Sequence, residues 1–335
     1  MTNNGLYFIA ELSGNHLGDI NRAKSLIDLA IASGANAVKL QTYTPETIAA
    51  DVMIESGPWA GRSYRDLYKE AALPWEWHEE LFNYAEDRGI TCFSTPYSLE
   101  AVDFLETLHC PIYKIASPEI TYLDLIGRAA ITHKPLIIST GMASVSEITR
   151  AIRTARAYGA GEITLLKCVS AYPAMPQYFN LRVLQHMKNT FIGCTFGLSD
   201  HSLGSAVAVA AVALGARVIE KHFTFSREEG GPDAAFSSEP AEFRAMVDDC
   251  QTAYSALGLA SYGPTDSEVV SMQYRRSLWV VRDIAPNQVI TTRDVEVLRP
   301  AKGIAPENYS RVIGRTTCRE IKAGTPLLWG DLRQI

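Results

Sequence analysis

The sequence predicts an α/β protein: a closed (β/α)8 barrel of the TIM type over residues 1–262, a linker over 263–276 and a small, mostly β domain over 277–335. Short apolar runs alternate with longer amphipathic stretches as far as residue 260, a pattern typical of a parallel sheet covered by helices. Eight such runs occur, which is the number of strands in a closed barrel. After residue 263 the sequence becomes polar and aperiodic, and short β-like pieces follow.

The strands are expected where apolar and β-branched residues cluster. They are residues 6–12, 37–41, 91–94, 112–115, 136–140, 163–168, 194–199 and 217–223. The competing architecture is an open, doubly wound sheet that binds a dinucleotide. Because no GxGxxG sequence follows the first strand, the closed barrel is favoured.

Helices are expected between these strands, and glycines mark three of their C-terminal ends. The segments 21–34, 75–89 and 144–159 each finish on glycine, the residue that most readily adopts the left-handed conformation beyond a helix. The last of these helices opens on a serine N-cap, Ser144 or Ser146.

The C-terminal domain is expected to consist of short β-like pieces joined by turns. The pieces are residues 277–283, 288–291, 317–321 and 326–330. A domain of this size buries only a small core. We therefore expect it to pack against the barrel or against another chain.

The composition is that of a folded protein without a nucleic-acid or membrane partner. Of the 335 residues, 47% are apolar and 20% are charged, which is enough apolar material to exclude wholesale disorder. The net charge is −6, and no tail concentrates basic residues. No apolar segment reaches the roughly 18 residues of a membrane span. Six cysteines without a CxxC pair indicate reduced thiols, so a soluble, cytoplasmic protein is expected.

In such a barrel the chemistry lies where strands end and loops begin, and these positions are unusually polar here. They carry four lysines together with hydroxyl, imidazole and carboxylate groups: Glu11, Asn15 and His16; Lys39 and Gln41; Ser94 and Thr95; Lys114 and Ser117; Ser139 and Thr140; Lys167 and Ser170; Ser199, Asp200 and His201; Glu220, Lys221 and His222. This set predicts a cationic pocket for a phosphate or carboxylate group, unless the lysines simply extend into solvent. Lys39 and Lys114 are the strongest candidates, because each lies in an apolar run where an unpaired ammonium group is costly.

Two histidines indicate a metal site. His201 and His222 stand 21 residues apart, about one βα repeat, so we expect them on neighbouring loops with Asp200 and Glu220 close by. Two imidazoles facing a cavity suit Mn, Fe, Co or Zn with positions open for substrate. The alternative is that these histidines serve only as hydrogen-bonding residues.

The loop after the eighth strand carries a candidate sugar ligand. Asp233 follows Gly230-Gly231-Pro232, and the two glycines permit close backbone approach. Its carboxylate can accept hydrogen bonds from sugar hydroxyl groups. A plain turn is the alternative interpretation.

A series of short segments follows one known order and spacing along nearly the whole chain. They are AELSGNH (10–16), VKLQTY (38–43), FSTP (93–96), YKIAS (113–117), IISTGM (137–142), GLSDHSLG (197–204), EKHFT (220–224), GGPDAAFS (230–237), RRSL (275–278) and LRPAKG (298–303). With these segments the chain resembles the sialic acid synthase family, and most closely its pseudaminic acid synthase branch. The resemblance implies condensation of phosphoenolpyruvate with an N-acetylated amino-sugar aldehyde and release of phosphate. It also implies a barrel followed by an antifreeze-like (SAF) domain, and a homodimer in which that domain covers the partner's barrel.

The resemblance also implies roles for single residues. The catalytic set would be His201, His222, Glu220 and Asp233, with the two histidines holding a divalent metal, most typically Mn with Co or Mg as alternatives. Phosphoenolpyruvate would be bound by Lys39, Thr95, Lys114, Ser117, Ser139, Ser170 and Ser199. The sugar would be bound by Asn15, His16, Leu17, Gln41, Tyr172 and Asp233, and by Arg299 from the small domain of a second copy.

The N-acetylneuraminate-forming branch of the family is similar to this chain, but it carries Glu at the position of Leu17. An apolar side chain suits a deoxygenated sugar. Because GGPDAAFS (230–237) is similar to the pseudaminic branch, the resemblance implies 2,4-diacetamido-2,4,6-trideoxy-L-altrose as the acceptor. A synthase of N-acetylneuraminate or legionaminate, acting on another N-acylated hexose, is the nearest alternative. More distant alternatives are an aldolase that forms a Schiff base through Lys167 or Lys221, and a non-catalytic sugar-binding protein.

Overall fold

The computed structural model describes residues 5–57 and 59–334. Residues 1–4, 58 and 335, which fall within the two expected domains, lie outside the described residues. Every side chain that the sequence analysis assigns to a site falls within the described part of the chain.

The chain forms two compact units, residues 1–258 and 259–335. The first unit ends just after the last barrel helix. The second unit therefore includes the expected linker, residues 263–276. Within that linker Val270–Tyr274 form a 3-10 helix, so the segment is not wholly irregular.

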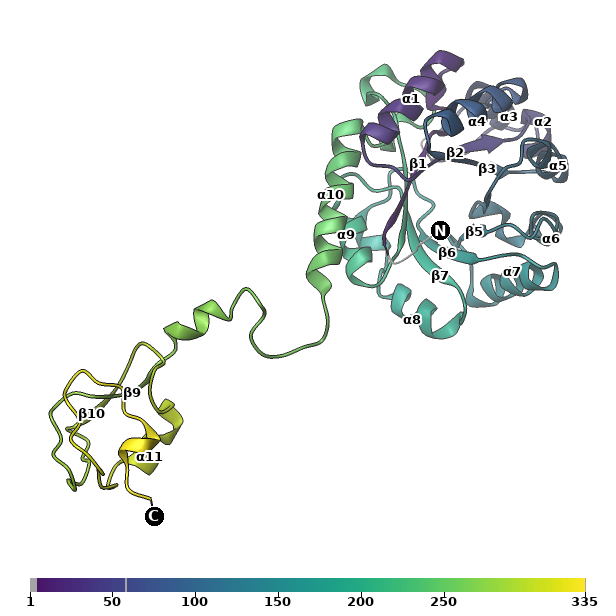
Figure 1. The fold of residues 1–335 in the computed structure, drawn as a ribbon. Coiled ribbons are helices and arrows are strands. Elements are labelled where there is room, and N and C mark those ends of the chain that lie inside the picture. The colour runs from purple at the N-terminus through teal and green to yellow at the C-terminus, as the bar shows by residue number, and fades with distance from the viewer. Residues whose placement is uncertain (1–4, 58, 335) are drawn as a thin grey trace. The chain divides into compact units, whose positions relative to one another are not determined.

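A closed barrel of eight parallel strands forms the core of the first unit, which confirms the predicted fold class (Figure 1). The strands are β1 (Tyr7–Glu11), β2 (Ala37–Thr42), β3 (Thr91–Pro96), β4 (Tyr113–Ile115), β5 (Leu136–Ser139), β6 (Ile163–Cys168), β7 (Thr195–Asp200) and β8 (Val218–His222). β8 pairs with β1, so the sheet closes without an edge. Each strand is almost wholly buried, because helices cover one face and side chains fill the other.

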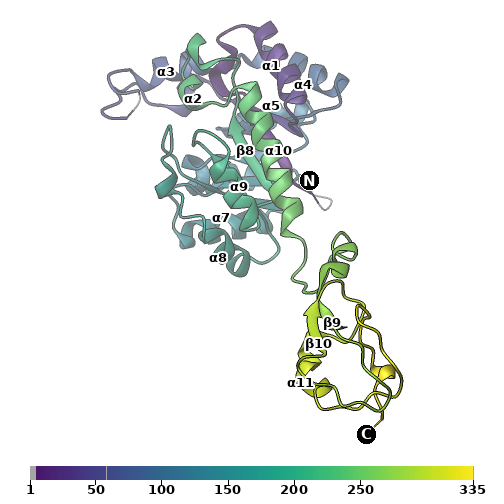
Figure 2. The ribbon, with the colours of Figure 1, turned by 90° about the vertical axis from the view of Figure 1, so that its left-hand side faces the viewer.

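Helices surround the barrel (Figures 1 and 2). They are α1 (Ile20–Ala32), α2 (Pro45–Ile48), α3 (Tyr64–Ala71), α4 (His78–Asp87), α5 (Leu99–Thr107), α6 (Leu123–Ala130), α7 (Val145–Ala157), α8 (Val183–Thr190), α9 (Ala206–Ala213) and α10 (Pro240–Leu257). Their ends follow the sequence signals. Ser144 caps α7 in a reciprocal pair with Glu147, and Gly34, Gly89 and Gly159 have positive φ angles just beyond α1, α4 and α7.

A buried ion pair joins the ends of β7 and β8 on the helix-covered face of the sheet. Lys221 Nζ donates to Asp200 Oδ2 at 2.7 Å and to the carbonyl oxygen of Ser202. Asp200 Oδ1 accepts from the Ser202 N–H at 2.9 Å and from its hydroxyl at 2.7 Å. Because side chains alternate along a strand, this outward position of Lys221 directs Glu220 and His222 to the barrel interior.

The second unit is a small β domain with its own core. β9 (Ser277–Val280) pairs antiparallel with β10 (Val295–Leu298), and α11 (Tyr309–Val312) follows. The core consists of Leu278, Val280, Ile284, Ile290, Val295, Ile304, Val312, Ile321, Leu327 and Leu332. Two details differ from expectation. The pieces after the first form isolated bridges, because each meets its partner over only one or two residues, and β10 lies in a segment that the sequence pattern did not indicate.

The cysteines are free, and most of them are buried. All six cysteines are free, and four of them are buried: Cys92, Cys110, Cys168 and Cys250. Burial raises the thiol pKa of Cys110 to about 12, which keeps that sulfur protonated and unreactive. Among the residues described, no helix has the length and apolar character needed to cross a membrane.

The Asp200–Lys221 pair leads to a stability prediction. Asp200→Ala should lower the free energy of unfolding by about 3–5 kcal/mol, because it leaves a buried ammonium group without its partner. Urea unfolding measures the loss. Asp248→Ala, which breaks the exposed pair with Arg244 on α10, is the matched control and should leave that free energy nearly unchanged. Equal losses in the two variants would contradict the role given to the buried pair.

Candidate active site

A row of buried polar groups lies on neighbouring strands at the mouth of the barrel. In the register of the sheet, Glu11 of β1 stands between Lys39 of β2 and His222 of β8. Lys39 forms an ion pair with Glu11 and donates to Thr95 Oγ1 at 3.1 Å. Gln41 Nε2 donates to Glu11 Oε1 at 2.7 Å. Strand pairing therefore fixes the relative positions of these groups.

A second buried ion pair links β4 to β8. Lys114 Nζ lies 3.3 Å from Glu220 Oε1, which also accepts from Ser199 Oγ at 3.0 Å. Burial opposes ionisation of Glu220, but Lys114 and Lys39 outweigh it and lower the pKa of this carboxyl group. Glu220 Oε2 is buried and has no hydrogen-bond partner among the described residues. Two lysines and a carboxylate with one unused oxygen therefore share the barrel interior.

Hydroxyl groups gather around a glycine that leaves room for them. A Cβ atom on Gly141 would lie 2.4 Å from Ser170 Oγ and 2.7 Å from Ser117 Oγ. The Gly141 N–H donates to Ser117 Oγ at 3.0 Å. Ser139 Oγ, at the end of β5, is buried without a partner in the described part of the chain. We call Ser117, Ser139 and Ser170 the hydroxyl cradle, since a side chain at position 141 would fill it.

His201 and His222 stand side by side, with ring centroids 5.3 Å apart. His201 Nδ1 lies 2.9 Å from the carbonyl oxygen of Val169. Because a carbonyl oxygen only accepts, Nδ1 carries a proton, and Nε2 has the lone pair when the ring is neutral. Burial opposes the charged ring, but Cys168 and the Val169 carbonyl group outweigh it and raise the pKa of His201. Burial lowers the pKa of His222 well below its ordinary value, and its Nδ1 has no hydrogen-bond partner among residues 5–57 and 59–334. Both rings can therefore offer a lone-pair nitrogen.

Asp233 and Leu17 give this mouth one polar and one apolar element. Ser13 Oγ donates to Asp233 Oδ2 and accepts from Gln41 Nε2 at 3.0 Å. Burial raises the pKa of Asp233 in spite of the Ser13 hydrogen bond. Leu17 packs on the same loop, because a Cβ atom on Gly231 would lie 2.6 Å from Leu17 Cδ2. A side chain at position 231 would displace the end of Leu17, and the φ of +113° there is a conformation that glycine adopts readily.

Two of the four expected lysines do not face this site. Lys221 pairs with Asp200 on the helix-covered face, so neither residue contributes to the mouth. Lys167 precedes the inward-facing Cys168 on β6 and donates to the Cys168 carbonyl oxygen at 3.0 Å. The expectation of four lysines at one mouth is therefore wrong, because Lys167 and Lys221 occupy the outward positions of the strand alternation.

Two expected sugar ligands, Asn15 and His16, are bonded to other groups of the chain. Asn15 Nδ2 donates to Phe223 O and Ser237 Oγ, both at 2.9 Å. His16 Nδ1 accepts from a backbone N–H at 3.1 Å, and its Nε2 lies 3.3 Å from the Ala71 carbonyl oxygen. These bonds hold the loop after β1 and leave His16 no free ring nitrogen. Arg299 is exposed and belongs to the second unit.

The structure adds residues that the sequence analysis did not assign. Glu119 follows Ser117 in the 3-10 helix Pro118–Thr121; burial raises its pKa to about 7, and its Oε2 lacks a partner among the residues described. Cys168 Sγ lies 3.9 Å from His201 Nδ1. The rings of Trp59 and Phe236 contact Tyr172 beside the histidines. Carboxylates are common in loops, so the sequence gives little sign that Glu119 belongs to the site. Its one signal is its position two residues after the strand-end Ser117.

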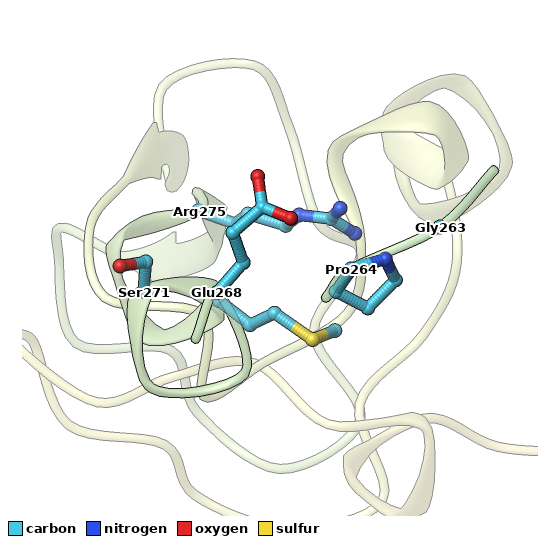
Figure 3. Close-up of a pocket in the computed structure, with 6 residues that line it drawn as sticks. Gly263, Pro264, Glu268, Ser271 and Arg275 are labelled. Atoms are coloured by element: carbon cyan, nitrogen blue, oxygen red, sulfur yellow. The ribbon is translucent and has the colours of Figure 1, made fainter. Parts of the chain in front are cut away.

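A hollow of about 370 Å³ lies elsewhere, in the second unit (Figure 3). It is lined by Gly263, Pro264, Glu268, Ser271, Met272 and Arg275, all of which are exposed. The Glu268 carboxylate already accepts from the N–H and hydroxyl of Thr265, each at 2.8 Å. The residues that line this hollow are exposed to solvent, whereas the polar groups of the barrel mouth are buried.

Comparison with known proteins agrees with both units. The NeuB family model matches residues 26–262, and the SAF domain model matches residues 275–333. The chain belongs to the NeuB family. The SAF match shows that the second unit is the antifreeze-like domain expected from the sequence.

Similar members of the NeuB family are synthases. The pseudaminic acid synthase of Helicobacter pylori is 40% identical over 332 residues, covering 97% of each chain. The N,N'-diacetyllegionaminic acid synthase of Legionella pneumophila is 36% identical and covers 96% of this chain and 93% of that one. The crystal structure of N-acetylneuraminic acid synthetase from Leptospira borgpetersenii, in complex with citrate, is 33% identical with a TM-score of 0.74, covering 82% of this chain and 92% of that chain. The chain is thus an enzyme of the sialic acid synthase type.

The Glu119 carboxyl group makes stability depend on pH. Its pKa rises from 4.5 to about 7 on folding, so between these values the folded chain holds a proton that the unfolded chain has lost. Stability contributed by this group therefore falls as pH rises through that window. Glu119→Gln should raise the free energy of unfolding at pH 8 by about 2–3 kcal/mol and change it little at pH 4. Urea unfolding at several pH values measures this, with the exposed Glu100→Gln as control; an unchanged pH slope in Glu119→Gln would refute it.

Proposed function

We propose that this chain is a pseudaminic acid synthase. It condenses phosphoenolpyruvate with 2,4-diacetamido-2,4,6-trideoxy-L-altrose to give a nine-carbon nonulosonic acid and inorganic phosphate. The observation that carries the proposal is the pair of buried lysines, Lys39 and Lys114, at a barrel mouth that also holds two neighbouring histidines. The 40% identity to a pseudaminic acid synthase over 97% of each chain supports the choice of product.

Phosphoenolpyruvate carries a phosphate and a carboxylate, and the barrel interior offers matching donors. Lys39 acts with Thr95, and Lys114 acts with Ser199 and the hydroxyl cradle. Hydrogen bonds between an ammonium group and a phosphate are stronger than neutral ones, and burial strengthens them further. Since Glu11 and Glu220 already hold both lysines in position, little reorganisation accompanies binding.

The residues at the mouth fit a divalent cation, which in this proposal is Mn²⁺, with Co²⁺ or Mg²⁺ as alternatives. His201 and His222 would hold it, since each has a lone-pair nitrogen and His222 Nδ1 lacks a partner among the described residues. No group of three or more His, Cys, Asp or Glu side chains suited to a metal occurs in the described part of the chain, so substrate or water would have to supply the remaining ligands. When bound, the ion supplies Lewis-acid polarisation of the sugar's aldehyde oxygen.

The acceptor sugar is held by the loops that follow β1 and β8. Asp233 accepts hydrogen bonds from sugar hydroxyl groups, and Gln41 is within the same hydrogen-bonded chain through Ser13. Leu17, seated on Gly231, presents a hydrocarbon surface that suits a sugar lacking hydroxyl groups. An acceptor with a hydroxyl group at that point would lose hydration without gaining a hydrogen bond.

The reaction forms one carbon–carbon bond and one carbon–oxygen bond from water, and it breaks the carbon–oxygen bond to phosphate. C3 of phosphoenolpyruvate attacks the aldehyde carbon, water adds at C2, and the tetrahedral adduct expels phosphate to leave a keto group. Lys39 and Lys114 hold the phosphate and carboxylate in register, so positioning and electrostatics supply much of the acceleration. Glu119, which exchanges its proton near pH 7, is the candidate acid–base group for the protons that the aldehyde oxygen gains and the water loses.

We also infer a homodimer in the cytoplasm. Residues 259–335 carry 11 Lys and Arg against 8 Asp and Glu, a net charge of +3, whereas residues 1–258 carry 20 against 29, a net charge of −9. Opposite charges favour association of the second unit of one copy with the barrel of another. Arg299, exposed in the second unit, would then meet the N-acyl group of the acceptor. The free thiols support a reducing compartment.

The Schiff-base aldolase is less well supported. A nucleophilic lysine must be neutral and must reach the substrate, but Lys221 is ion-paired with Asp200 on the helix-covered face. Lys167 donates to a backbone carbonyl group on the outward side of β6. A legionaminate or N-acetylneuraminate synthase remains the alternative for the acceptor, since a legionaminic acid synthase is 36% identical.

Phosphate release across a panel of acceptors tests the function. The trideoxy-altrose should give the highest kcat/KM, and N-acetylmannosamine should be at least tenfold poorer because its hydroxyl groups meet Leu17. Leu17→Glu should narrow or reverse this ratio, with the exposed Leu203→Glu as control. Phosphate release without any acceptor dependence would contradict a synthase.

The anion site is tested by removing one ammonium group. Lys114→Met should lower kcat/KM for phosphoenolpyruvate by about 100-fold, the loss expected for a charge-assisted contact of about 3 kcal/mol. Lys167→Met is the matched control, because it removes a strand-end lysine that faces outward, and it should keep wild-type kinetics. If Lys167→Met were the inactive variant and borohydride trapped substrate on the protein, the aldolase would be favoured instead.

The metal is tested by equilibrium binding as well as by activity. A chelator should abolish phosphate release and added Mn²⁺ should restore it. His222→Ala should weaken Mn²⁺ binding, measured by electron paramagnetic resonance, at least tenfold, whereas the exposed His186→Ala should not. Wild-type Mn²⁺ affinity in stripped His222→Ala would contradict the proposed site.

A further inference from the structure

The segment between α2 and α3 forms a hairpin that reaches the candidate active site through Trp59. Met53 and Ser63 form an antiparallel bridge, and the Ile54 N–H donates to the Arg62 carbonyl oxygen at 2.8 Å. Ile54 is buried whereas Met53 is 57% exposed, so one side of the hairpin is anchored. The hairpin carries Trp59, whose ring contacts Tyr172 in the candidate site but which has no assigned role there.

Trp59 joins a cluster of rings beside the histidines. Its ring centroid lies 5.5 Å from that of Tyr172 and 6.4 Å from that of Phe236. Tyr172 lies 4.4 Å from the His201 ring, and Phe236 lies 5.0 Å from the His222 ring. We call Trp59, Tyr172 and Phe236 the aromatic wall. The wall therefore unites the loops after β2, β6 and β8 next to the paired imidazoles.

The polar atom of Trp59 is already bonded within the chain. Its Nε1–H donates to the Pro232 carbonyl oxygen at 3.1 Å. Pro232 immediately precedes Asp233 and follows Gly231, on which Leu17 packs. The indole group therefore ties the hairpin to the loop that carries the proposed sugar ligand, and the ring offers only its hydrocarbon surface to a ligand.

The ring face of Trp59 suits the acceptor sugar better than it suits phosphoenolpyruvate. The face of an aromatic ring carries partial negative charge, so it gives no favourable contact to phosphoenolpyruvate. It packs well against the C–H face of a sugar, a 6-deoxy methyl group or the methyl of an acetamido group. Half-burial of Trp59 leaves part of its ring available for such a contact.

We propose that Trp59 is a contact and specificity residue for the acceptor sugar. Its ring packs on an apolar part of the sugar, and its N–H fixes the position of the Asp233 loop. The proposal rests on the proposed function and extends it, because it adds aromatic side chains to a sugar site that already contains Leu17 and Asp233.

Steady-state kinetics of three variants tests this. Trp59→Leu should raise the KM for the trideoxy-altrose acceptor by roughly tenfold and leave the KM for phosphoenolpyruvate unchanged, because only the sugar loses an aromatic contact. Trp59→Phe keeps a ring and should recover most of the loss. Met53→Ala, on the same hairpin, is the matched control and should behave as wild type. A Trp59→Leu enzyme with an unchanged acceptor KM, or with both KM values raised equally, would overturn the proposal.

Direct binding separates this proposal from the proposed function. Saturation-transfer NMR with the acceptor and phosphate-release assays are run on the same wild-type and Trp59→Leu proteins. If no acceptor drives phosphate release yet the sugar binds wild type and not Trp59→Leu, the proposed function fails and the Trp59 contact stands. If the sugar binds both proteins equally, or neither, the Trp59 contact is refuted whatever the turnover.

Discussion

Two ammonium groups inside the barrel depend on two carboxylates. Lys39 is 4% exposed and Lys114 is 2% exposed, and each is held by a glutamate, Glu11 or Glu220. An unpaired buried charge would shift its pKa or destabilise the fold, so the pairs must form together with the sheet. Burial opposes the charged form of both lysines. The neighbouring carboxylates outweigh burial at Lys39 and raise its pKa, whereas the pKa of Lys114 is lowered. Both pairs hold the lysine nitrogens at the mouth, where a phosphate or carboxylate ligand finds donors already in position.

The geometry of the mouth depends on contacts made outside it. On β8, the outward Lys221 is locked to Asp200, and this fixes the inward positions of Glu220 and His222. The Val169 carbonyl group lies outside the mouth as well, and it accepts a hydrogen bond from His201 Nδ1. The two imidazole groups therefore lie side by side because side chains alternate in direction along two neighbouring strands. Hydrogen bonds outside the substrate site hold them there.

The barrel and the polar strand ends could be predicted from the sequence because both follow periodicity. Apolar runs mark the strands. The C-terminal ends of parallel strands meet at one rim, and the structure has Lys39, Lys114, His201 and His222 together at that rim. The direction of a side chain at a strand end was not predictable, because a shift of one residue reverses it, and Lys167 and Lys221 were misjudged for this reason. Glu119 and Trp59 lie in loops without a period, so only burial and long-range contacts reveal them.

The central claim is that the two buried lysines form a binding site for phosphoenolpyruvate. A calorimetric titration of phosphoenolpyruvate into the Mn²⁺-loaded protein, repeated from about 50 to about 500 mM salt, tests it most directly, because buried charges are screened far less than exposed ones. The account predicts one molecule bound per chain with an affinity that falls only modestly with salt. Absence of saturable binding, or an affinity that collapses with salt as at an exposed basic patch, would contradict it.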